Sequence, residues 1–534
     1  MKAFAALLVL LICNNWQQLH GARILCLIAT PEHNNPSWTQ PFFEALAERG
    51  HLLTVVSTLA DPSIPGITHI PVSNDYDVIK KHYVNEMGYY NNYWDIKQVL
   101  IWYEALLGTC QSAAEIDLVK MLEKVKHKYD LIIYDATYSM ECLLSKFPKF
   151  RKVPVLALSG GKLTTDLMHL VQAENTINPA TIPHFISHLP REMSHWQRIQ
   201  NHVLYLTESF IRWAVVKPVL NGIHKHEYAS PEVQLVLLNT HPVLDHVQNI
   251  PPNVIEVGGL HIRAESEPLS FSTQEFLERS SEGIIYINLP HIDLMYGVGL
   301  RAIENMVREY RQFGFLWNVN NVKDPTLSKN FHNLRTINVR DNMQQNILAQ
   351  SNIKAFLTHG DNFGLQEAIY NAVPVIVLPL LMDQFNNAQR VKERDLGIQI
   401  SVGDFSVDSL SEALKQIVRD KVYSKALHQA QFNFRTRQVK PVDQAVWYAE
   451  QLIGQPKLFE HLSVPKSLEY GYFITQSLEV LVYPLLFIII FIINFILLIW
   501  NCKSGKKKTK QHQIAKKLKR KMRSDGTENE LKKD

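Results

Sequence analysis

Short apolar segments alternate with amphipathic ones along the first 250 residues of the chain. Residues 23–30 (RILCLIAT) form an apolar run rich in strand formers, the next segment carries Phe42 and Leu46 on one helical face, and a second apolar run follows at 51–57. A strand, a helix and another strand in this order predict a βαβ unit, and therefore a parallel sheet with a right-handed crossover. Further buried strands are predicted at 129–135, 153–159 and 233–240.

The alternation starts again after the turn at Pro251-Pro252 and a polar stretch at 263–282, in which no element is predicted. Strands are predicted at 283–289, 314–319, 334–339, 353–360, 373–380 and 397–402, with helices near 299–313 and 364–371 and from Asp383 onward. This pattern predicts an α/β protein of two Rossmann-like domains with a hinge near residue 255. Ligands of open parallel sheets lie beyond the carboxyl ends of the strands, so the cleft between the two domains is the expected site.

Segment 82–103 is dense in Tyr and Trp. Two interpretations stay open for it. Its rings either wall an apolar pocket or pack in the core or at a domain interface.

Two apolar segments at the ends of the chain concern targeting. Lys2 and the apolar run 3–13 predict a secretory signal peptide that ends near residue 22, with a signal anchor as the alternative. Residues 480–502 carry no charge, and about 20 such residues span the hydrocarbon core of a bilayer as a helix. The basic block after this span predicts a type I orientation, with the body in a lumen or outside the cell and the tail in the cytosol. Lys532 near the end of the tail is either part of a dilysine-like retrieval signal or an ordinary solvated charge.

Charge is distributed unevenly in this chain of 534 residues and net charge +4. From Lys503 to the end there are 13 basic and 4 acidic residues, a net charge of +9, so the rest carries 4 − 9 = −5. The body is therefore not a nucleic-acid binder by charge.

The cysteines do not suggest a disulfide scaffold or a metal site. If Cys13 is removed with the signal peptide and Cys502 faces the cytosol, Cys26, Cys110 and Cys142 remain in the body. Three such cysteines form at most one disulfide, whose pairing the sequence leaves open. No CxxC or HExxH pattern is present, and no metal is expected.

The densest polar constellation lies in FLTHGDNFGLQEAIYNAVPVIVLPLLMDQFNNAQR, residues 356–390. His359 and Gly360 follow a predicted strand and open a helix whose free N–H groups suit a phosphate. Glu367 lies farther along that helix. Asp383 and Gln384 follow the next strand, where a carboxylate and an amide can hydrogen-bond sugar hydroxyls.

These motifs resemble the membrane-bound UDP-glycosyltransferases, the UDP-glucuronosyltransferase type of animals, of which the chain looks like a divergent member. The resemblance includes ALAERGH at 45–51, NVIEVGGLHI at 253–262, the segment 356–390 and the C-terminal anchor with its lysine-rich tail. It implies the two-domain GT-B fold. The expected organisation is a signal peptide (1–22), an acceptor-binding domain (23–255), a UDP-sugar-binding domain (256–455), a juxtamembrane segment (456–478), a transmembrane helix (479–501) and a cytosolic tail (502–534).

The resemblance also implies roles for individual residues. His359 and Gly360 match the positions that contact the diphosphate, and Glu367 the one that contacts the ribose. Gln344 matches a uracil contact. Asp383 and Gln384 match sugar contacts. The UDP-sugar is then a co-substrate, and no cofactor is expected.

The implied reaction is an inverting transfer in which a histidine acts as general base and an aspartate orients it. Asp135 occupies the aspartate position, whereas the histidine position is Asn35, in PEHNNPSW. His33, two residues away, is the alternative base. Other departures lie near the donor: Asp361 replaces a glycine, Phe363 an asparagine or serine, Asp341 a tryptophan, and Pro290-His291 a glycine-serine turn.

Two functions are carried forward. The first is a UDP-glycosyltransferase of the endoplasmic reticulum membrane that conjugates small lipophilic acceptors with a glucuronate or glucose-like sugar. The second is a catalytically degenerate relative that binds a lipophilic ligand or a partner in the same cleft. The plasma membrane is the alternative location. The sequence does not decide the sugar, the acceptor or the oligomeric state, and a homo-oligomer is compatible with it.

Overall fold

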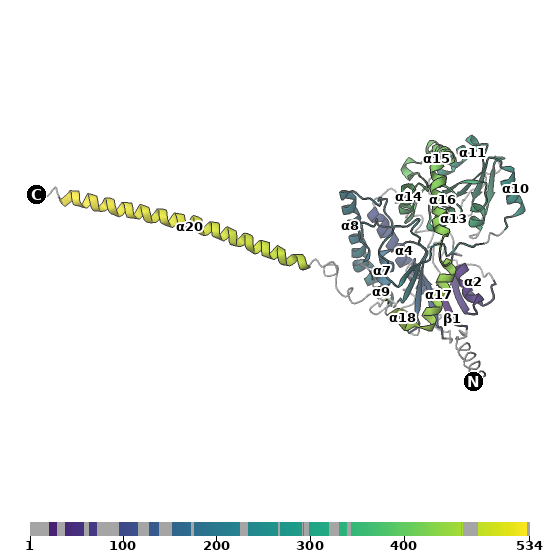
Figure 1. Cartoon of the computed structure of the whole chain (residues 1–534), viewed down its shortest axis with the longest axis horizontal. Helices are drawn as coiled ribbons and strands as arrows, with labels where there is room; N and C mark the ends of the chain where they lie inside the picture. Colours follow the sequence, from purple (N-terminus) through teal and green to yellow (C-terminus); the bar gives the residue numbers. More distant parts are fainter. Residues whose placement is uncertain are drawn as a thin grey trace, which may run out of the picture. The chain divides into compact units, whose positions relative to one another are not determined.

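The computed structural model describes residues 21–28, 38–57, 63–71, 95–115, 128–137, 152–171, 173, 176–224, 233–264, 268–290, 292, 298–319, 331–338, 343–460, 462 and 479–530. The chain divides into two compact units, Met1–Val464 and Pro465–Asp534 (Figure 1). The first unit contains two parallel sheets, and the second contains one long helix.

The first sheet has the strand order β3-β2-β1-β4-β5-β6-β7, and every neighbouring pair is parallel. Its strands are β1 (Arg23–Ile28), β2 (Leu52–Ser57), β3 (Ile67–Pro71), β4 (Leu131–Asp135), β5 (Val155–Ser159), β6 (Leu235–Leu238) and β7 (Val254–Glu256). The chain runs outward from β1 to β3 and then returns to the other side of β1. The carboxyl ends of β1 and β4 therefore form the topological switch point, where ligands of such sheets bind.

The second sheet has the order β10-β9-β8-β11-β12-β13 and is also parallel throughout. Its strands are β8 (Ile284–Asn288), β9 (Gly314–Asn318), β10 (Leu334–Ile337), β11 (Ile353–Thr358), β12 (Val375–Val377) and β13 (Gly397–Gln399). Its switch point lies between β8 and β11. The two predicted Rossmann-like sheets are thus confirmed.

Helices connect the strands of both sheets. In the first half they are α2 (Gln40–Glu48), α4 (Asp95–Glu115), α7 (Thr165–Leu170), α8 (His195–Ile211), the π-helix η3 (Arg212–Val216) and α9 (Lys217–His224). In the second half they are α10 (Phe271–Arg279), α11 (Val298–Glu309), α12 (Met343–Leu348), α13 (Asn362–Tyr370), α14 (Gln384–Glu393), the 3₁₀-helix η6 (Val402–Asp404), α15 (Val407–Arg419) and α16 (Lys421–Arg435).

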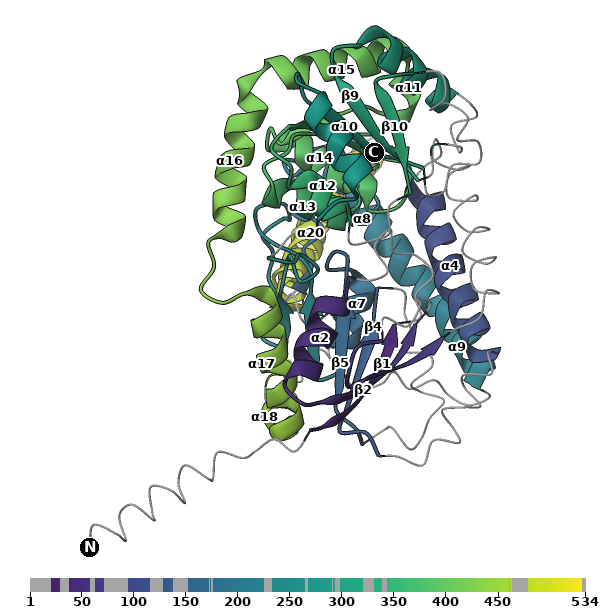
Figure 2. The same cartoon turned by 90° about the vertical axis from the view of Figure 1, so that its right-hand side faces the viewer.

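The chain finally crosses back from the second half to the first, through α16 to α17 (Pro441–Gly454) and α18 (Pro456–Glu460) (Figure 2). α17 packs against α2. Ala445 and Leu452 share a buried cluster with Phe42 and Leu46, so apolar contact fastens this last segment to the first sheet.

Many helices of the first unit, such as α8 and α15, were not predicted by the sequence analysis, and two strands and the helix in the polar stretch were missed as well. The edge strands β3 and β7 are short and partly exposed, so they lack a buried apolar run. Helix α10 lies inside the polar stretch 263–282. Ser270 caps it by accepting a hydrogen bond from the N–H of Thr273, and Leu277 is buried. The buried face is too narrow to stand out among polar residues.

The aromatic segment 82–103 is described from α4 onward. Trp102 and Tyr103 are buried in the same cluster as Ile285 and Ile287 of the second sheet. This part of the segment therefore packs at the interface between the two halves, and Trp102 also lines a cavity there, so it fits both interpretations. Cys26 is buried in β1 and free, and Cys142 lies outside the described residues.

The second unit contains α20, which extends from Glu479 to Glu530. Its segment Val482–Trp500 is the one stretch, among the described residues, that is long and apolar enough to cross a membrane. None of the residues in that segment is buried.

Candidate active site

A cavity of about 90 Å³ lies between the carboxyl ends of strands from the two sheets. Residues that follow β4 and β5 line it from the first half, among them Thr137 and Lys162. Residues that follow β11 and β12 line it from the second half, among them Asp361, Asp383 and Gln384. The predicted interdomain cleft is therefore present, and it brings polar side chains of both halves together.

His359 and Gly360 are placed in a buried loop directly after β11. The Nδ1 atom of His359 lies 2.9 Å from the carbonyl oxygen of Leu378, so Nδ1 carries a proton and donates it. Gly360 has a φ of +85°, and a Cβ at this position would lie 2.4 Å from Cγ1 of Val377. A side chain would be strained and would clash there, which explains the glycine. Both residues lie at the carboxyl end of β11, although neither lines the 90 Å³ cavity among its described residues.

The Asp361 carboxylate caps the helix that a phosphate would be expected to approach. Its Oδ1 accepts a hydrogen bond of 2.8 Å from the N–H of Gly364 in the first turn of α13. Burial raises the pKa of this carboxyl, and the hydrogen bond from Gly364 opposes the rise. The side chain that replaces the family's glycine thus occupies an N–H group that could otherwise bind an anion.

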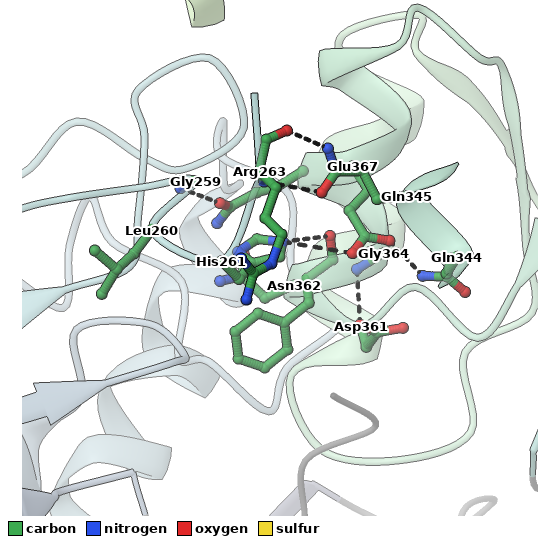
Figure 3. A network of polar contacts seen from close by, with 12 residues as sticks. Gly259, Leu260, His261, Arg263, Gln344, Gln345, Asp361, Asn362, Gly364 and Glu367 are labelled. Atoms are coloured by element: carbon green, nitrogen blue, oxygen red, sulfur yellow. Dashed lines mark hydrogen bonds and ion pairs between the residues drawn. The ribbon is translucent and has the colours of Figure 1, made fainter. Parts of the chain in front are cut away.

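Gln344 and Glu367 are joined to each other in a buried polar network (Figure 3). The amide of Gln344 donates to Oε2 of Glu367 at 2.7 Å, and its oxygen accepts from the amide of Asn288 at 2.5 Å. His261 Nε2 lies 3.9 Å from Oε1 of Glu367. The structure therefore brings the residues predicted to contact uracil and ribose side by side.

Asp383 and Gln384 begin α14 and both line the cavity. The amide of Asn387 donates to Oδ2 of Asp383 at 2.9 Å and to the carbonyl oxygen of Gly360 at 2.9 Å. Gln384 is buried, and its Oε1 accepts the N–H groups of Leu380 and Leu381, both at 2.9 Å. The amide oxygen of Gln384 thus holds the preceding loop, which leaves its NH₂ group as the end that can face a ligand.

Asp135 ends β4 and is fully buried. Its Oδ1 accepts the N–H of Thr137 at 2.9 Å. Since β1 pairs with β4, the end of β1, from which segment 29–37 departs, lies beside Asp135. His33 and Asn35 belong to that segment and lie outside the described residues. Asp341 and His291, in other parts of the chain, also lie outside the described residues.

Lys162 is a cavity residue that the sequence analysis missed. It is buried, and its Nζ donates to Oδ1 of Asn386 in the other half at 2.5 Å. Burial and the nearby Arg390 guanidinium lower the pKa of Lys162 well below its usual range, whereas Asp383 and Asp245 oppose this shift. Arg390 is paired with Asp245 at 2.5 Å. The sequence carries a signal for this residue: SGGK, residues 159–162, places a lysine just beyond the carboxyl end of β5, where side chains face the cleft.

Direct contacts hold the two halves together around this site. Asn362 donates to the carbonyl oxygens of Gly160 and Asn239, both at 2.9 Å. Gln366 donates to the same carbonyl of Asn239 at 2.8 Å. The Phe363 ring lies 5.6 Å from the Trp38 ring and belongs to the buried cluster of the first sheet. Phe363, a departure from the family pattern, therefore packs as an apolar wedge between the halves.

His261 closes this interface from the segment that follows β7, the last strand of the first sheet. Its Nε2 lies 3.3 Å from the carbonyl oxygen of Phe363, and its Nδ1 lies 3.4 Å from the amide nitrogen of Asn239. Burial lowers the pKa of His261 to about 3. The ring is therefore neutral at physiological pH, with Nε2 as donor and Nδ1 as acceptor.

The described residues contain no group of three or more His, Cys, Asp and Glu side chains placed to hold a metal ion. What the arrangement offers is a set of carboxylate, amide and ammonium groups beside a small cavity.

Comparison with known proteins gives concordant results. Residues 43–513 match the family described as UDP-glucoronosyl and UDP-glucosyl transferase. UDP-glucosyltransferase 2 of Dactylopius coccus is 26% identical over 458 residues, which cover 81% of this chain and 84% of that protein. UDP-glucuronosyltransferase 1A8 of Rattus norvegicus is 25% identical over 453 residues, which cover 78% of this chain and 81% of that protein.

Solved structures share the fold. The calicheamicin glycosyltransferase CalG4 matches with a TM-score of 0.51 at 15% identity, over 82% of this chain and 100% of that chain. Os79 from O. sativa, solved in complex with UDP, matches with a TM-score of 0.51 at 14% identity, over 80% of this chain and 99% of that chain. The predicted GT-B arrangement of two Rossmann-like domains is confirmed.

Proposed function

The chain belongs to the UDP-glucuronosyl and UDP-glucosyl transferase family, and on this premise we propose that it transfers a glucuronate or glucose-like sugar from a UDP-sugar to a small lipophilic acceptor, with inversion. One observation carries the proposal: the cavity joins Asp383 and Gln384 of the second half to Thr137 and Lys162 of the first. A donor and an acceptor held by different halves meet at such a place.

The donor site is assigned to the second half. His359 and Gly360 are proposed to lie against the diphosphate, Glu367 and Gln344 against the nucleoside, and Asp383 and Gln384 against the sugar hydroxyls. Lys162 is the one basic side chain among the described residues that line the cavity, and we assign to it an anionic group of the donor, whose negative charge would favour the protonated lysine against its lowered pKa. The UDP-sugar acts as co-substrate, and neither a cofactor nor a metal is required.

The acceptor site is assigned to the first half. Trp102 and Phe185 line the cavity, and their rings lie 5.5 Å apart, edge to face. Met382 lines it from the opposite half. Aromatic and thioether side chains form an apolar wall that favours a lipophilic acceptor.

In the proposed reaction, the acceptor hydroxyl attacks the anomeric carbon while the bond to UDP breaks, and the hydroxyl proton passes to a base. Asp135 is buried at the end of β4, beside the strand end from which segment 29–37 departs. It would orient a histidine of that segment and stabilise its charged form. We assign the base to His33, because Asn35 lacks a basic nitrogen. An amine, thiol or carboxylate acceptor would need no strong base.

The apolar segment Val482–Trp500 and the net charge of +9 from Lys503 onward support a membrane location. We propose a single-pass type I protein of the endoplasmic reticulum membrane, with its body in the lumen.

A second candidate function is favoured by Asp361 and Phe363. The first caps α13 with its carboxylate, and the second packs against Trp38. Asp361 occupies an N–H group that could bind a diphosphate, and Phe363 replaces a polar side chain that could hydrogen-bond to one. The alternative is therefore a degenerate relative that binds a lipophilic ligand or a partner in the cleft without transfer.

Purified full-length protein in membranes, incubated with radiolabelled UDP-glucose, UDP-glucuronate and UDP-N-acetylglucosamine and a mixed panel of phenols, alcohols and amines, separates the two functions. Transferase function predicts a labelled conjugate with at least one donor, lost in Asp383→Ala. A complete absence of conjugate, beside an active control enzyme, with a lipophilic ligand still bound in calorimetry, would establish the degenerate relative.

A further inference from the structure

Helix α8 presents an apolar face to the solvent. Six apolar side chains recur at intervals of three and four residues, which places them on one side of the helix. Their exposed fractions range from 42% to 77%. We name them the outer stripe: Trp196, Ile199, Val203, Leu206 and Phe210 of α8, and Trp213 in the π-helical turn that follows.

The opposite side of the same helix packs on the body, although it carries polar side chains. Asn201, Leu204, Glu208 and Ile211 are buried. Asn201 donates to the carbonyl oxygen of Pro179 at 2.6 Å, and Glu208 lies 3.2 Å from Nε2 of His184. These buried polar groups have partners, so the helix cannot be rotated to bury its apolar side without leaving them unsatisfied. Helix α8 therefore buries a face of mixed polarity and leaves its apolar stripe in the solvent, unlike an ordinary surface helix, whose apolar stripe faces the core.

An exposed apolar face of this kind marks a surface that contacts either another protein or a membrane. Half of its six members are aromatic, and the rings of Phe210 and Trp213 lie 6.0 Å apart. Trp is enriched where a bilayer meets water, whereas the seam of a coiled coil is built from Leu, Ile and Val. One helix face also falls well short of the roughly 20–30 residues a side that a stable protein interface needs.

The chain itself brings a bilayer within reach. Seventeen residues, 465–481, join the end of the first unit at Val464 to the apolar segment that starts at Val482. Fully extended, they span at most about 60 Å, so the body stays near the membrane that holds this segment. Arg198 is exposed in the first turn of α8, and Lys217 is exposed at the start of α9, which follows the π-helical turn; lysine and arginine suit anionic headgroups.

We propose that the outer stripe of α8 lies in the interfacial layer of the bilayer that anchors the chain. This inference rests on the membrane anchor in the proposed function but not on sugar transfer. The first unit is then attached to the membrane twice, through the outer stripe and through the chain that leads to segment 482–500. These attachments keep the cleft close to the lipid phase from which lipophilic acceptors partition.

The test is lipid photolabelling of the full-length protein in phosphatidylcholine–phosphatidylserine vesicles that contain a diazirine-tagged lipid. Adducts are mapped by mass spectrometry, without UDP-sugar. We expect adducts on residues 196–213 in the wild type, and at least fivefold fewer in Leu206→Glu/Phe210→Glu. Both replaced side chains are more than half exposed, so the fold is expected to tolerate them. The matched control is Gln200→Glu/Ser209→Glu, which adds the same charge to the flanks of the stripe and is expected to keep wild-type labelling.

Segment 482–500 is the internal standard, because it is expected to be labelled in every variant. Label on 482–500 with none on 196–213 in the wild type would overturn the proposal without depending on the fold of any variant. Absence of label from both segments would overturn the anchor as well. Cross-linking of two copies through residues 196–213 would show that a second copy covers the stripe, and would also overturn it.

Discussion

Asp361 and Gly364 are joined by a hydrogen bond of 2.8 Å in which the Asp361 carboxylate accepts the N–H that opens α13. The N–H groups of a helix start are the natural partners of a phosphate. In this protein a built-in anion already holds one of them. The relationship explains how a carboxylate is tolerated where the family has glycine, and it predicts how donor binding can be improved.

Replacement of Asp361 should separate the capping role from the charge. Asp361→Asn keeps a good cap and removes the negative charge, so UDP should bind more tightly by about 1 kcal/mol, the scale of two nearby charges in a water-like medium. Asp361→Ala removes the cap as well and should lower the free energy of unfolding by about 1 kcal/mol. Calorimetric titration with UDP and denaturant unfolding measure the two effects. Equal UDP affinity in Asp361→Asn and wild type would show that the carboxylate does not oppose the nucleotide.

Lys162 should matter for donor binding. Its Nζ reaches Asn386 at 2.5 Å across the cleft, and we expect it to contact an anionic group of the donor. Lys162→Met keeps most of the apolar stem and removes the cation, so affinity for the UDP-sugar should fall by about 1.5–3 kcal/mol, the value of a charged hydrogen bond. Lys152→Met, which removes an exposed lysine just before β5, is the control and should bind the donor like the wild type. An unchanged donor affinity in Lys162→Met would limit this lysine to the contact with Asn386.

Acid should destabilise the protein through His261. Burial lowers its pKa to about 3, against about 6.5 for an ordinary histidine. Below pH 6.5 the unfolded chain therefore binds a proton that the folded chain does not, and stability falls as the pH drops toward 3 at about 1.4 kcal/mol per pH unit. Between pH 7 and pH 5 the loss due to this residue is about 2 kcal/mol. The hydrogen bond from Nε2 to the carbonyl oxygen of Phe363 opposes this lowering of the pKa but does not outweigh burial.

His261→Gln keeps a donor and an acceptor but does not titrate. Urea unfolding of wild type and variant at pH 5 and pH 7 isolates the effect of His261 from those of His241 and His246, whose pKa values burial lowers to about 4 and about 2. The variant should lose about 2 kcal/mol less than the wild type over this interval. Parallel losses would show that His261 becomes protonated in the folded protein.

The general base can be tested by restoring it. If Asn35 occupies the base position, Asn35→His should raise transfer to hydroxyl acceptors by ~10²–10⁴-fold, the usual contribution of a positioned base. Asp135 has to orient the new imidazole, so Asn35→His combined with Asp135→Ala should lose most of the gain. Initial rates with a phenolic acceptor at saturating UDP-sugar measure both effects.

His33→Ala tests the rival base. If His33 takes the proton in the wild type, its removal should abolish transfer, and Asn35→His should then add little to the wild-type rate. An enzyme that stays inert as Asn35→His while it binds UDP-sugar would point to the donor-side changes at Asp341, Asp361 and Pro290, and to the degenerate relative.

The sequence by itself predicted the elements whose signal is local. Buried parallel strands such as β4 and β11 are continuous apolar runs, and α13 follows a polar loop, so periodicity placed them within a few residues. The apolar helix at Val482–Trp500 was equally readable, because hydrocarbon length and the absence of charge depend on neighbours alone. The resemblance to the family then selected residues at strand ends.

Tertiary structure decided which partner each polar side chain has. Asp361 serves its own helix, Gln344 joins Glu367, and Lys162 reaches Asn386, 224 residues away in the sequence. Such pairs depend on how the two sheets face each other. No spacing rule encodes that geometry, and one carboxylate or amide is locally like any other. Helix α8 is the same case. The helical period of 3.6 residues defines an apolar stripe and an opposite face of mixed polarity, but only packing against His184 and Pro179 determined that the mixed face lies inside.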